Sequence, residues 1–173
     1  MVGLPSALEV RIRPAQRMDL PAVVALRRTV GWGSGGLEGS FLAADAGRQA
    51  ILVADLDGAL VGAVTVAFQS GAPPTRGHVS DLLVSPLWRR RGVGTQLLQA
   101  AEQAAQARGV HDCTLDVDAH NAVALALYRR SGYGPYRPAQ FPWGPGVTLR
   151  KEIGPRPAPR APGLLARWRW RLR

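Results

Sequence analysis

Three consecutive arginines lead directly into two closely spaced glycines in the segment RRRGVG, residues 89–94. A strand-like apolar run precedes this segment, and apolar positions at helical spacing follow it. Glycines let a backbone approach a phosphate closely, and the free N–H groups of a helix's first turn attract anions. The segment lacks both the GK[ST] of a nucleoside-triphosphate loop and the GxGxxG of dinucleotide folds. On this segment alone, a phosphate site and a tight turn with solvated arginines are equally good interpretations.

Thiol and metal chemistry are not indicated by the remaining reactive residues. The one cysteine, Cys113, lies in a strand-like segment, so we expect a buried and unreactive thiol. With three histidines and no CxxC pair, no zinc site and no other metal is predicted. A single cysteine fits a reducing compartment, and we find neither a signal peptide nor a membrane-spanning run, so a cytoplasmic location is expected.

The elements that must position the glycine–arginine segment follow from the apolar periodicities, which predict one layer of sheet with helices packed on it. Strands are expected at residues 8–13, 51–55, 60–68, 76–84, 113–117 and 147–153. Helices are expected after Asp19, which can cap the first of them, and at residues 37–46, 95–108 and 121–130. A turn on Asp57-Gly58 joins two strands as a hairpin, whereas AQFPWGPG, residues 139–146, is expected to be a loop.

Positive charge gathers at the C-terminal end of the chain. The net charge is +10, and residues 154–173 hold six arginines and no acid, so the remainder is only mildly basic. We expect one domain over residues 1–153, a proline-rich linker over 154–163 and a basic Trp/Arg tail over 164–173. The tail alternates as RWRWRLR, which suits either strand pairing across a homodimer or a disordered extension; nucleic acid or a membrane is a less favoured partner.

Two longer segments add the context that the loop lacks. In DLLVSPLWRRRGVGTQLL, a strand segment and Pro86 precede Arg89, Gly92 and Gly94. In LDVDAHNAVALALYRRSGY, an Asn opens a helix that carries an Ala and a Leu-Tyr pair and closes on a Gly-aromatic pair; these are Asn121, Ala124, Leu127, Tyr128, Gly132 and Tyr133. Together the segments resemble the GNAT superfamily of acyl-CoA-dependent N-acyltransferases, whose central pattern is Gln or Arg, two residues, Gly, one residue, then Gly or Ala. The resemblance spans residues 79–133 and implies an α/β (α+β) fold with a mixed central sheet of about six to seven strands and helices on both faces.

The resemblance also implies where acetyl-CoA, the expected co-substrate, would bind. Backbone groups of Leu82, Leu83 and Val84 would pair with the pantetheine arm as if it were another strand. Arg89 occupies the family's signature position. The pyrophosphate would be held by the N–H groups of the loop residues that follow it, which are Arg90, Arg91, Gly92, Val93, Gly94 and Thr95. Many members have a second glycine where this chain has Arg90. Asn121 would contact the pantetheine or the adenine-proximal part, Ala124 belongs to the same motif, and Tyr128 would face the sulfur.

The catalytic residues implied by the resemblance are Tyr128 and, less directly, Asp81. A tyrosine with a pKa of about 10 is a reasonable proton donor to a thiolate whose conjugate acid has a pKa of about 8.5, although Tyr128 could instead only pack and hydrogen-bond. Family members often carry a Glu on the strand before the loop, and here the candidate positions hold Ser80 and Asp81. Asp81 could be the base, could orient the amine or could be structural; otherwise water takes the proton. His78 lies close enough to be kept in mind.

Three function hypotheses follow. The first is an N-acetyltransferase that moves an acetyl group from acetyl-CoA to a primary amine of a small molecule or a protein N-terminus. The second is a non-catalytic acyl-CoA sensor of the same fold, and the third is a nucleic-acid-binding protein. The acceptor would be selected by residues 30–40 and 136–146. Aromatic side chains in or next to these segments either line a pocket or pack in the core: Trp32, Phe41, Phe141 and Trp143.

Overall fold

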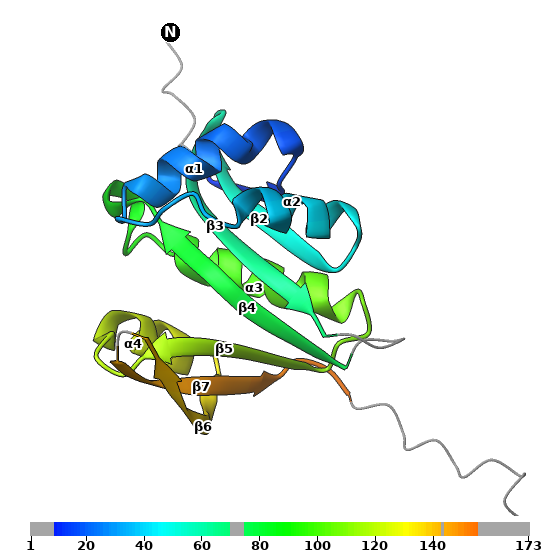
Figure 1. The fold of residues 1–173 in the computed structure, drawn as a ribbon, viewed down its shortest axis with the longest axis vertical. Helices are drawn as coiled ribbons and strands as arrows, with labels where there is room; N and C mark the ends of the chain where they lie inside the picture. The colour runs from blue at the N-terminus through cyan, green and yellow to red at the C-terminus, as the bar shows by residue number, and fades with distance from the viewer. Residues whose placement is uncertain (1–8, 70–74, 143, 156–173) are drawn as a thin grey trace, which may run out of the picture.

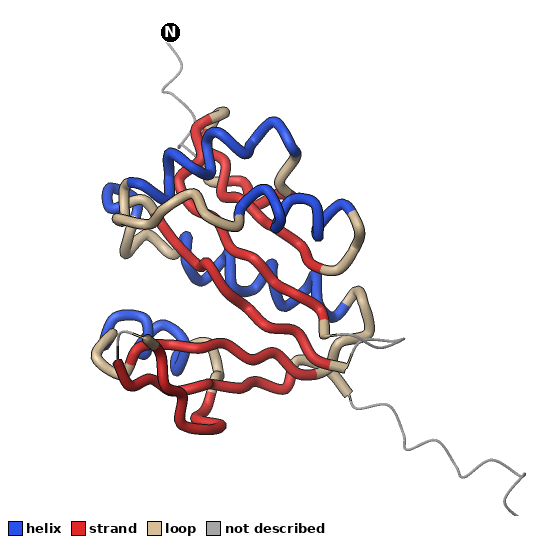
Figure 2. Tube along the Cα trace, viewed as in Figure 1, coloured by secondary structure: helices blue, strands red, loops and turns tan. Residues whose placement is uncertain are grey.

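The computed structural model describes residues 9–69, 75–142 and 144–155, which form one mixed sheet with α-helices on both faces (Figures 1 and 2). The strands are β1 Arg11–Pro14, β2 Gln49–Leu56, β3 Ala59–Phe68, β4 Arg76–Val84, β5 Asp112–Asp118, β6 Gly134–Phe141 and β7 Gly144–Glu152. The helices are α1 Leu20–Arg28, α2 Leu37–Asp45, α3 Val93–Gln106 and α4 Ala122–Arg130, with short 3-10 turns at Arg17–Asp19 and Pro86–Trp88.

The seven strands lie in the order β1-β2-β3-β4-β5-β7-β6. Neighbouring strands are antiparallel except β4 and β5, which are parallel and are joined through α3. The turn between β2 and β3 is the predicted one, with Asp57 and Gly58 both at positive φ (50° and 89°), as a two-residue hairpin requires. The predicted fold class, a mixed sheet with helices on both faces, is confirmed.

Alternating side chains divide the core into two clusters, one on each face of the sheet. On β2, Leu52 and Ala54 pack with α3, whereas Ile51 and Val53 pack with α1 and α2. Helices α1 and α2 lie on β3 and β2 and reach the end of β4 at Leu83, so this face of β5, β7 and β6 has no helix over it in the described structure (Figure 1). The open part of the sheet is therefore available for a ligand.

One predicted loop is wrong. The segment AQFPWGPG, expected to be a loop, contributes to a seventh strand, β6, and to the start of β7. The prolines and glycines of this segment led to the loop prediction, but β6 is an edge strand, and an edge strand accepts proline because half of its N–H groups face no partner.

The predicted cap of the first helix is also wrong in its detail. Asp19 precedes α1, yet its side chain makes no hydrogen bond to that helix. The carboxylate instead accepts from the Gln16 N–H at 2.7 Å and from the Arg13 guanidinium at 2.7 and 2.9 Å. The Arg13 hydrogen bonds hold the pKa of Asp19 below its usual range, and they tie β1 to the start of α1.

A buried polar pair joins the two halves of the sheet beneath α3. The Lys151 Nζ on β7 donates to the Glu102 carboxylate on α3 at 2.7 Å, and it lies 5.8 Å from the Tyr133 ring centre. Cys113 is fully buried beside this pair, and burial raises the pKa of its thiol to about 12. The predicted buried, unreactive thiol is consistent with that position.

Several expectations fall on parts of the chain outside the described residues. These are Trp143, nearly all of the predicted linker and the whole basic tail. Within the described ranges, no helix is both long enough and apolar enough to cross a membrane.

Gly146 on β7 gives a test of the β6–β7 hairpin. A Cβ there would lie 2.7 Å from the Val117 carbonyl oxygen and would collide with the Phe141 ring. We expect Gly146→Ala to lower the free energy of unfolding by about 1–3 kcal/mol, because the added methyl overpacks the site. Thermal denaturation measures the change.

The matched control is Gly39→Ala on α2, where a Cβ would meet nothing within 4 Å. Alanine there should be neutral or stabilising by about 0.5–1 kcal/mol, since it is the better helix former. Equal melting temperatures for the two variants would contradict the packing assigned to the hairpin.

Candidate active site

A β-bulge in β4 creates the central feature of the site. Ala63 and Thr65 on β3 are two residues apart, but their partners on β4, Leu83 and Ser80, are three apart. Asp81 within the bulge has φ of 52°, an uncommon value for a residue with a side chain. The inserted residue exchanges the faces of the strand: Val79 packs with the α3 cluster, and Leu83 packs with the α1/α2 cluster.

The bulge coincides with the point at which β4 and β5 separate. Their parallel pairing runs from Arg76 with Asp112 to Val79 with Leu115 and ends there. Beyond it, Leu83 and Val84 pair with β3 on one side only, and the end of β5 pairs with β7 (Figure 2). The β5-facing edge of residues 82–84 therefore has backbone groups without a strand partner, as an extended amide-bearing arm would require.

The glycine–arginine loop forms the start of α3 as predicted. Gly92 is the N-cap residue with φ of 83°, which favours glycine. The first intrahelical bond runs from the Gln96 N–H to the Gly92 carbonyl at 3.0 Å, so the N–H groups of residues 93–95 precede it. Val93 is buried and anchors the turn. This arrangement suits an anion at the helix N-terminus, where the helix dipole is positive.

Two of the three arginines are occupied within the chain. The Arg89 Nε donates to the Val84 carbonyl at 3.1 Å and fixes the end of β4. The Arg91 guanidinium stacks 4.9 Å from the centre of the Trp88 ring. Arg90 is exposed with φ of 63°, which gives a physical reason for glycine at that position in other family members. Arg89 and Arg91 thus have contacts within the chain, while all three arginine side chains remain exposed.

Gly94 lies where three parts of the predicted site meet. A Cβ on it would be 3.5 Å from the Leu127 side chain on α4 and 3.7 Å from the Val84 side chain on β4. The start of α3, the free edge of β4 and the helix that carries Tyr128 are thus neighbours. The two motifs, about 30 residues apart in the sequence, come together at one place.

Helix α4 presents Tyr128 from within the core. Asn121 caps this helix, because its Oδ1 accepts from the Ala124 N–H at 3.1 Å. Tyr128 is 9% exposed and meets Tyr133 edge to face, with 6.1 Å between ring centroids. Burial raises the pKa of the Tyr128 hydroxyl, and no group in the described structure hydrogen-bonds to it, so the hydroxyl stays protonated at neutral pH and is free to donate.

Arg27 on α1, which the sequence analysis did not single out, connects the bulge to the loop after α1. Its Nη1 donates to the Asp81 carboxylate at 3.2 Å, and its Nε donates to the Gly33 carbonyl at 2.8 Å. The guanidinium also lies 5.6 Å from the centre of the Trp32 ring. The sequence does not reveal this role, because Arg27 on α1 and Asp81 on β4 are far apart in the chain and meet only in the folded structure.

Two other predicted residues can now be placed. Phe41 is buried in the α1/α2 cluster, and it also lines a cavity with Leu20 and Leu42. The Phe141 side chain lies close to Gly146 in the β6–β7 hairpin. Across residues 9–69, 75–142 and 144–155, no three His, Cys, Asp or Glu side chains gather in a way that could hold a metal ion.

Comparison with known families now decides the assignment. The model of the Acetyltransferase (GNAT) family matches residues 27–133, well over half of the chain. The chain belongs to the GNAT acetyltransferase family. The family suggested by the two sequence motifs is confirmed, and the bulge, the strand separation and the α3 N-terminus are parts of a GNAT domain.

Relatives and structural neighbours agree with this assignment. The chain is 44% identical over 65 residues to the acetyl transferase GW6a of Oryza sativa subsp. japonica, a match that covers 37% of this chain and 16% of that protein. It is 33% identical over 93 residues to an N-alpha-acetyltransferase of Sulfurisphaera tokodaii, with 49% and 56% covered. The chain thus spans well under two thirds of these relatives' lengths. The structure of YncA from Salmonella typhimurium with its cofactor acetyl-CoA shares the fold, with a TM-score of 0.73, 17% identity, and 88% and 99% covered.

The two glycines of the loop give a matched pair of variants. Gly92→Ala places a side chain at φ of 83° and should weaken acetyl-CoA binding about tenfold, because the left-handed conformation costs about 1–2 kcal/mol. Gly94→Ala needs no such conformation and adds only ordinary contacts, so binding should be retained. Isothermal titration calorimetry measures both affinities, and equal losses in the two variants would contradict the role given to Gly92.

Proposed function

We propose that this protein is an N-acetyltransferase that moves an acetyl group from acetyl-CoA to a primary amine. The observation that carries the proposal is the meeting of Val84, Gly94 and Leu127, which brings the α3 N-terminus, the free edge of β4 and the Tyr128 helix together. A phosphate-binding turn, a strand edge for amide groups and a buried proton donor are the three features that an acyl-CoA reaction needs. Only their combination favours this reaction over simple anion binding.

The residues present fit acetyl-CoA. The N–H groups of residues 93–95 would bind the pyrophosphate, and the β5-facing edge of Leu82, Leu83 and Val84 would pair with the pantetheine amides. Arg89 already bonds to the Val84 carbonyl, so we assign it to holding the strand end and not to the phosphate. Arg90 is the arginine of the loop that remains for the phosphates, and Arg91 stays on Trp88. The bound co-substrate supplies a thioester whose carbonyl carbon accepts the amine.

Tyr128 supplies the proton that the departing sulfur requires. As the amine nitrogen forms a C–N bond with the acetyl carbon and the C–S bond breaks, the Tyr128 hydroxyl protonates the thiolate. Its buried position keeps the proton on the oxygen until that moment, since burial disfavours the phenolate. The proton lost by the amine must leave on the opposite, open face of the sheet, where Asp81 and water are the available acceptors.

Asp81 is the proposed group on the amine side, and its partner limits what it can do. One carboxylate oxygen accepts from Arg27, while the side chain as a whole is 37% exposed. A second candidate function, an acyl-CoA sensor without turnover, follows if this ion pair makes Asp81 purely structural. Small-molecule amines and protein N-termini both remain in the acceptor class; similarity to an N-alpha-acetyltransferase supports the latter. The single buried cysteine supports a reducing, cytoplasmic setting.

Tyr128→Phe tests the reaction directly. We expect kcat for free-thiol release across a panel of amines to fall about 100-fold, while acetyl-CoA affinity stays within twofold, because only the proton donor is removed. Tyr133→Phe is the control, since it removes the hydroxyl from the other ring of the same pair. Unchanged turnover in Tyr128→Phe would contradict the role of this hydroxyl as proton donor. Absence of turnover in the unmodified protein would favour the acyl-CoA sensor.

Asp81→Asn separates a base from a structural carboxylate. Asparagine tolerates the left-handed conformation that the bulge imposes, so the variant loses the charge but keeps the backbone. If Asp81 accepts the proton, kcat falls and the acidic limb of the pH–rate profile disappears, whereas Arg27→Gln retains that limb. If Asp81 only holds Arg27, both variants show the same change in KM and in melting temperature, and the base is water.

A further inference from the structure

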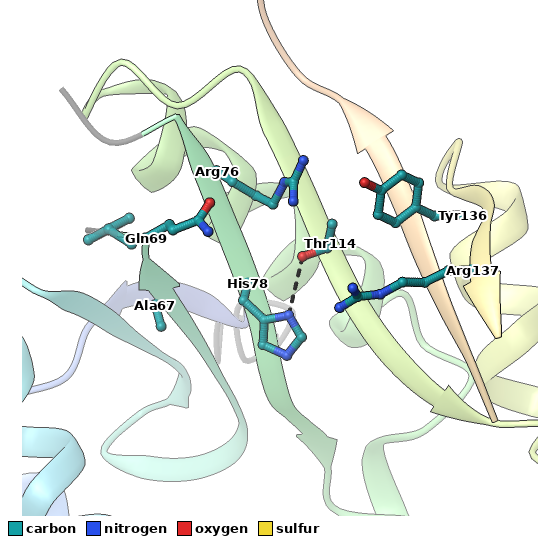
Figure 3. Close-up of a pocket in the computed structure, with 8 residues that line it drawn as sticks. Ala67, Gln69, Arg76, His78, Thr114, Tyr136 and Arg137 are labelled. Carbon is teal, nitrogen blue, oxygen red and sulfur yellow. Dashed lines mark hydrogen bonds between the residues drawn. The ribbon is translucent and has the colours of Figure 1, made fainter. Parts of the chain in front are cut away.

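The open face of the sheet carries a cavity that acetyl-CoA binding does not use. Thr114 and His78 lie between neighbours whose side chains point into the α3 cluster, so both face the other side, where no helix covers β5. The cavity measures about 280 Å³, and its polar walls are Gln69, Arg76, His78, Thr114, Tyr136 and Arg137 (Figure 3). His78 and Thr114 hydrogen-bond at 3.2 Å in its floor.

A second β-bulge builds one wall of this cavity. Pro135 and Arg137 on β6 pair with the adjacent residues Leu149 and Thr148 of β7, so Tyr136 is an extra residue. Consecutive strand residues normally face opposite sides, but here Tyr136 and Arg137 both line the same cavity (Figure 3). The bulge directs a ring and a guanidinium toward the same space.

Arg76 and Arg137 line the cavity, and one carboxylate lies next to it, since Asp116 Oδ2 is 3.9 Å from His78 Nε2. Arg76, Arg137 and Arg150 all lie within 6.0 Å of the centre of the Tyr136 ring. Arg150 is neutralised, since it donates to Asp112 at 2.8 and 3.0 Å and to Glu152 at 3.2 Å. Arg76 and Arg137 have no carboxylate partner among the described residues.

Arg76 also carries a buried donor with nothing to bind. Its Nε is shielded from solvent and has no hydrogen-bond partner in the described structure. A buried, unsatisfied N–H of a charged group is costly, and a ligand oxygen would remove that cost. Two guanidiniums without a carboxylate partner, a buried Nε–H without a hydrogen-bond partner and the neutral donor Gln69 together form a site for a carboxylate.

The position of the cavity relates it to the amine. Arg76 and His78 are on β4, the strand that carries Asp81, and they precede it by five and three residues. At about 3.3 Å per residue, they lie about 16 and 10 Å from the bulge along the strand. A free amino acid cannot bridge this distance, because its amine and carboxyl carbon are only about 2.5 Å apart.

We propose that the cavity binds a carboxylate of the acceptor, held about 10–16 Å from the reacting amine by Arg76 and Arg137. This inference rests on the proposed acetyl transfer for the identity of the amine end. The acceptor is thus an extended amine with a remote acid. In a peptide at about 3.3–3.6 Å per residue, the acid belongs at the fourth or fifth position from the free N-terminus.

A peptide ladder tests the inference. Six-residue peptides with a free N-terminus, an amidated C-terminus and otherwise neutral small residues carry one Asp at position 2, 3, 4 or 5, each with an Asn-containing twin. Free-thiol release with acetyl-CoA should give a kcat/KM at least tenfold higher for Asp than for Asn at position 4 or 5, expressed mainly in KM. Free aspartate and asparagine form a second arm, for which no difference is expected.

Arginine variants test whether the preference for Asp over Asn peptides arises in the cavity. Arg137→Gln, on an exposed part of β6, should abolish the Asp preference and leave turnover of the Asn peptides within twofold, and Arg76→Gln should act in the same direction. Arg11→Gln, on β1 at the opposite edge of the sheet, is the control and should keep the preference. Equal kcat/KM for Asp and Asn twins in the unmodified protein, or a preference that survives in Arg137→Gln, would overturn the inference.

A binding measurement separates this inference from the proposed function. Calorimetric titration of the same twins into the CoA-bound protein reports on the cavity without turnover. Tighter binding of the Asp peptide that depends on Arg137, with no thiol release from any peptide, would keep the anion site and remove acetyl transfer to peptides. Turnover with no Asp preference in rate or binding would keep acetyl transfer to peptides and remove the anion site.

Discussion

One extra residue in β4 determines most of what this molecule can do. Regular pairing on both sides would bury every backbone group of a central strand and leave no edge for a ligand. By inserting Asp81 at positive φ, the chain reverses the faces of β4 and ends its ladder with β5 after Val79. The backbone groups so released lie beside the N-terminus of α3, and Leu83 beyond the bulge packs with α1 and α2. The proposed cofactor side and the proposed acceptor side of the site both follow from the same local irregularity.

The conformational cost of that irregularity is borne by the contacts around it. A non-glycine residue at positive φ persists only where its surroundings enforce it. Here the Asp81 side chain is held by Arg27, and the end of the strand is held by Arg89 through the Val84 carbonyl. Both arginines therefore act on the shape of the site before any ligand arrives. In the arginine run of residues 89–91, Arg89 bonds to the end of β4 and Arg91 stacks on Trp88, so two of the three side chains also stabilise the local structure.

Local patterns in the sequence were sufficient for the fold class, the α3 N-terminus and the two motifs. Gly92 and Gly94 are informative because their conformations and contacts are decided within a few residues. The sequence did not reveal β6, because its prolines oppose a strand unless the strand is known to lie at an edge, which is a property of the whole sheet. The contacts of Asp19 and Arg27 were missed for a related reason, because their partners, Arg13 and Asp81, are set by how separate elements pack together. The β-bulges at Asp81 and Tyr136 leave no mark in a single sequence, yet they position the free strand edge and the arginine-lined cavity.

The Glu102–Lys151 pair has a chemical consequence beyond its structural one. Lys151 is the one lysine in the chain, and its amine is committed to a carboxylate at 2.7 Å behind α3. Thioesters acylate free lysine amines without any enzyme, so a protein that handles such a donor is exposed to slow modification of its own surface. With arginine at every other Lys/Arg position, the one lysine of this chain is the partner of Glu102, so an acyl donor bound as proposed would meet few competing amines.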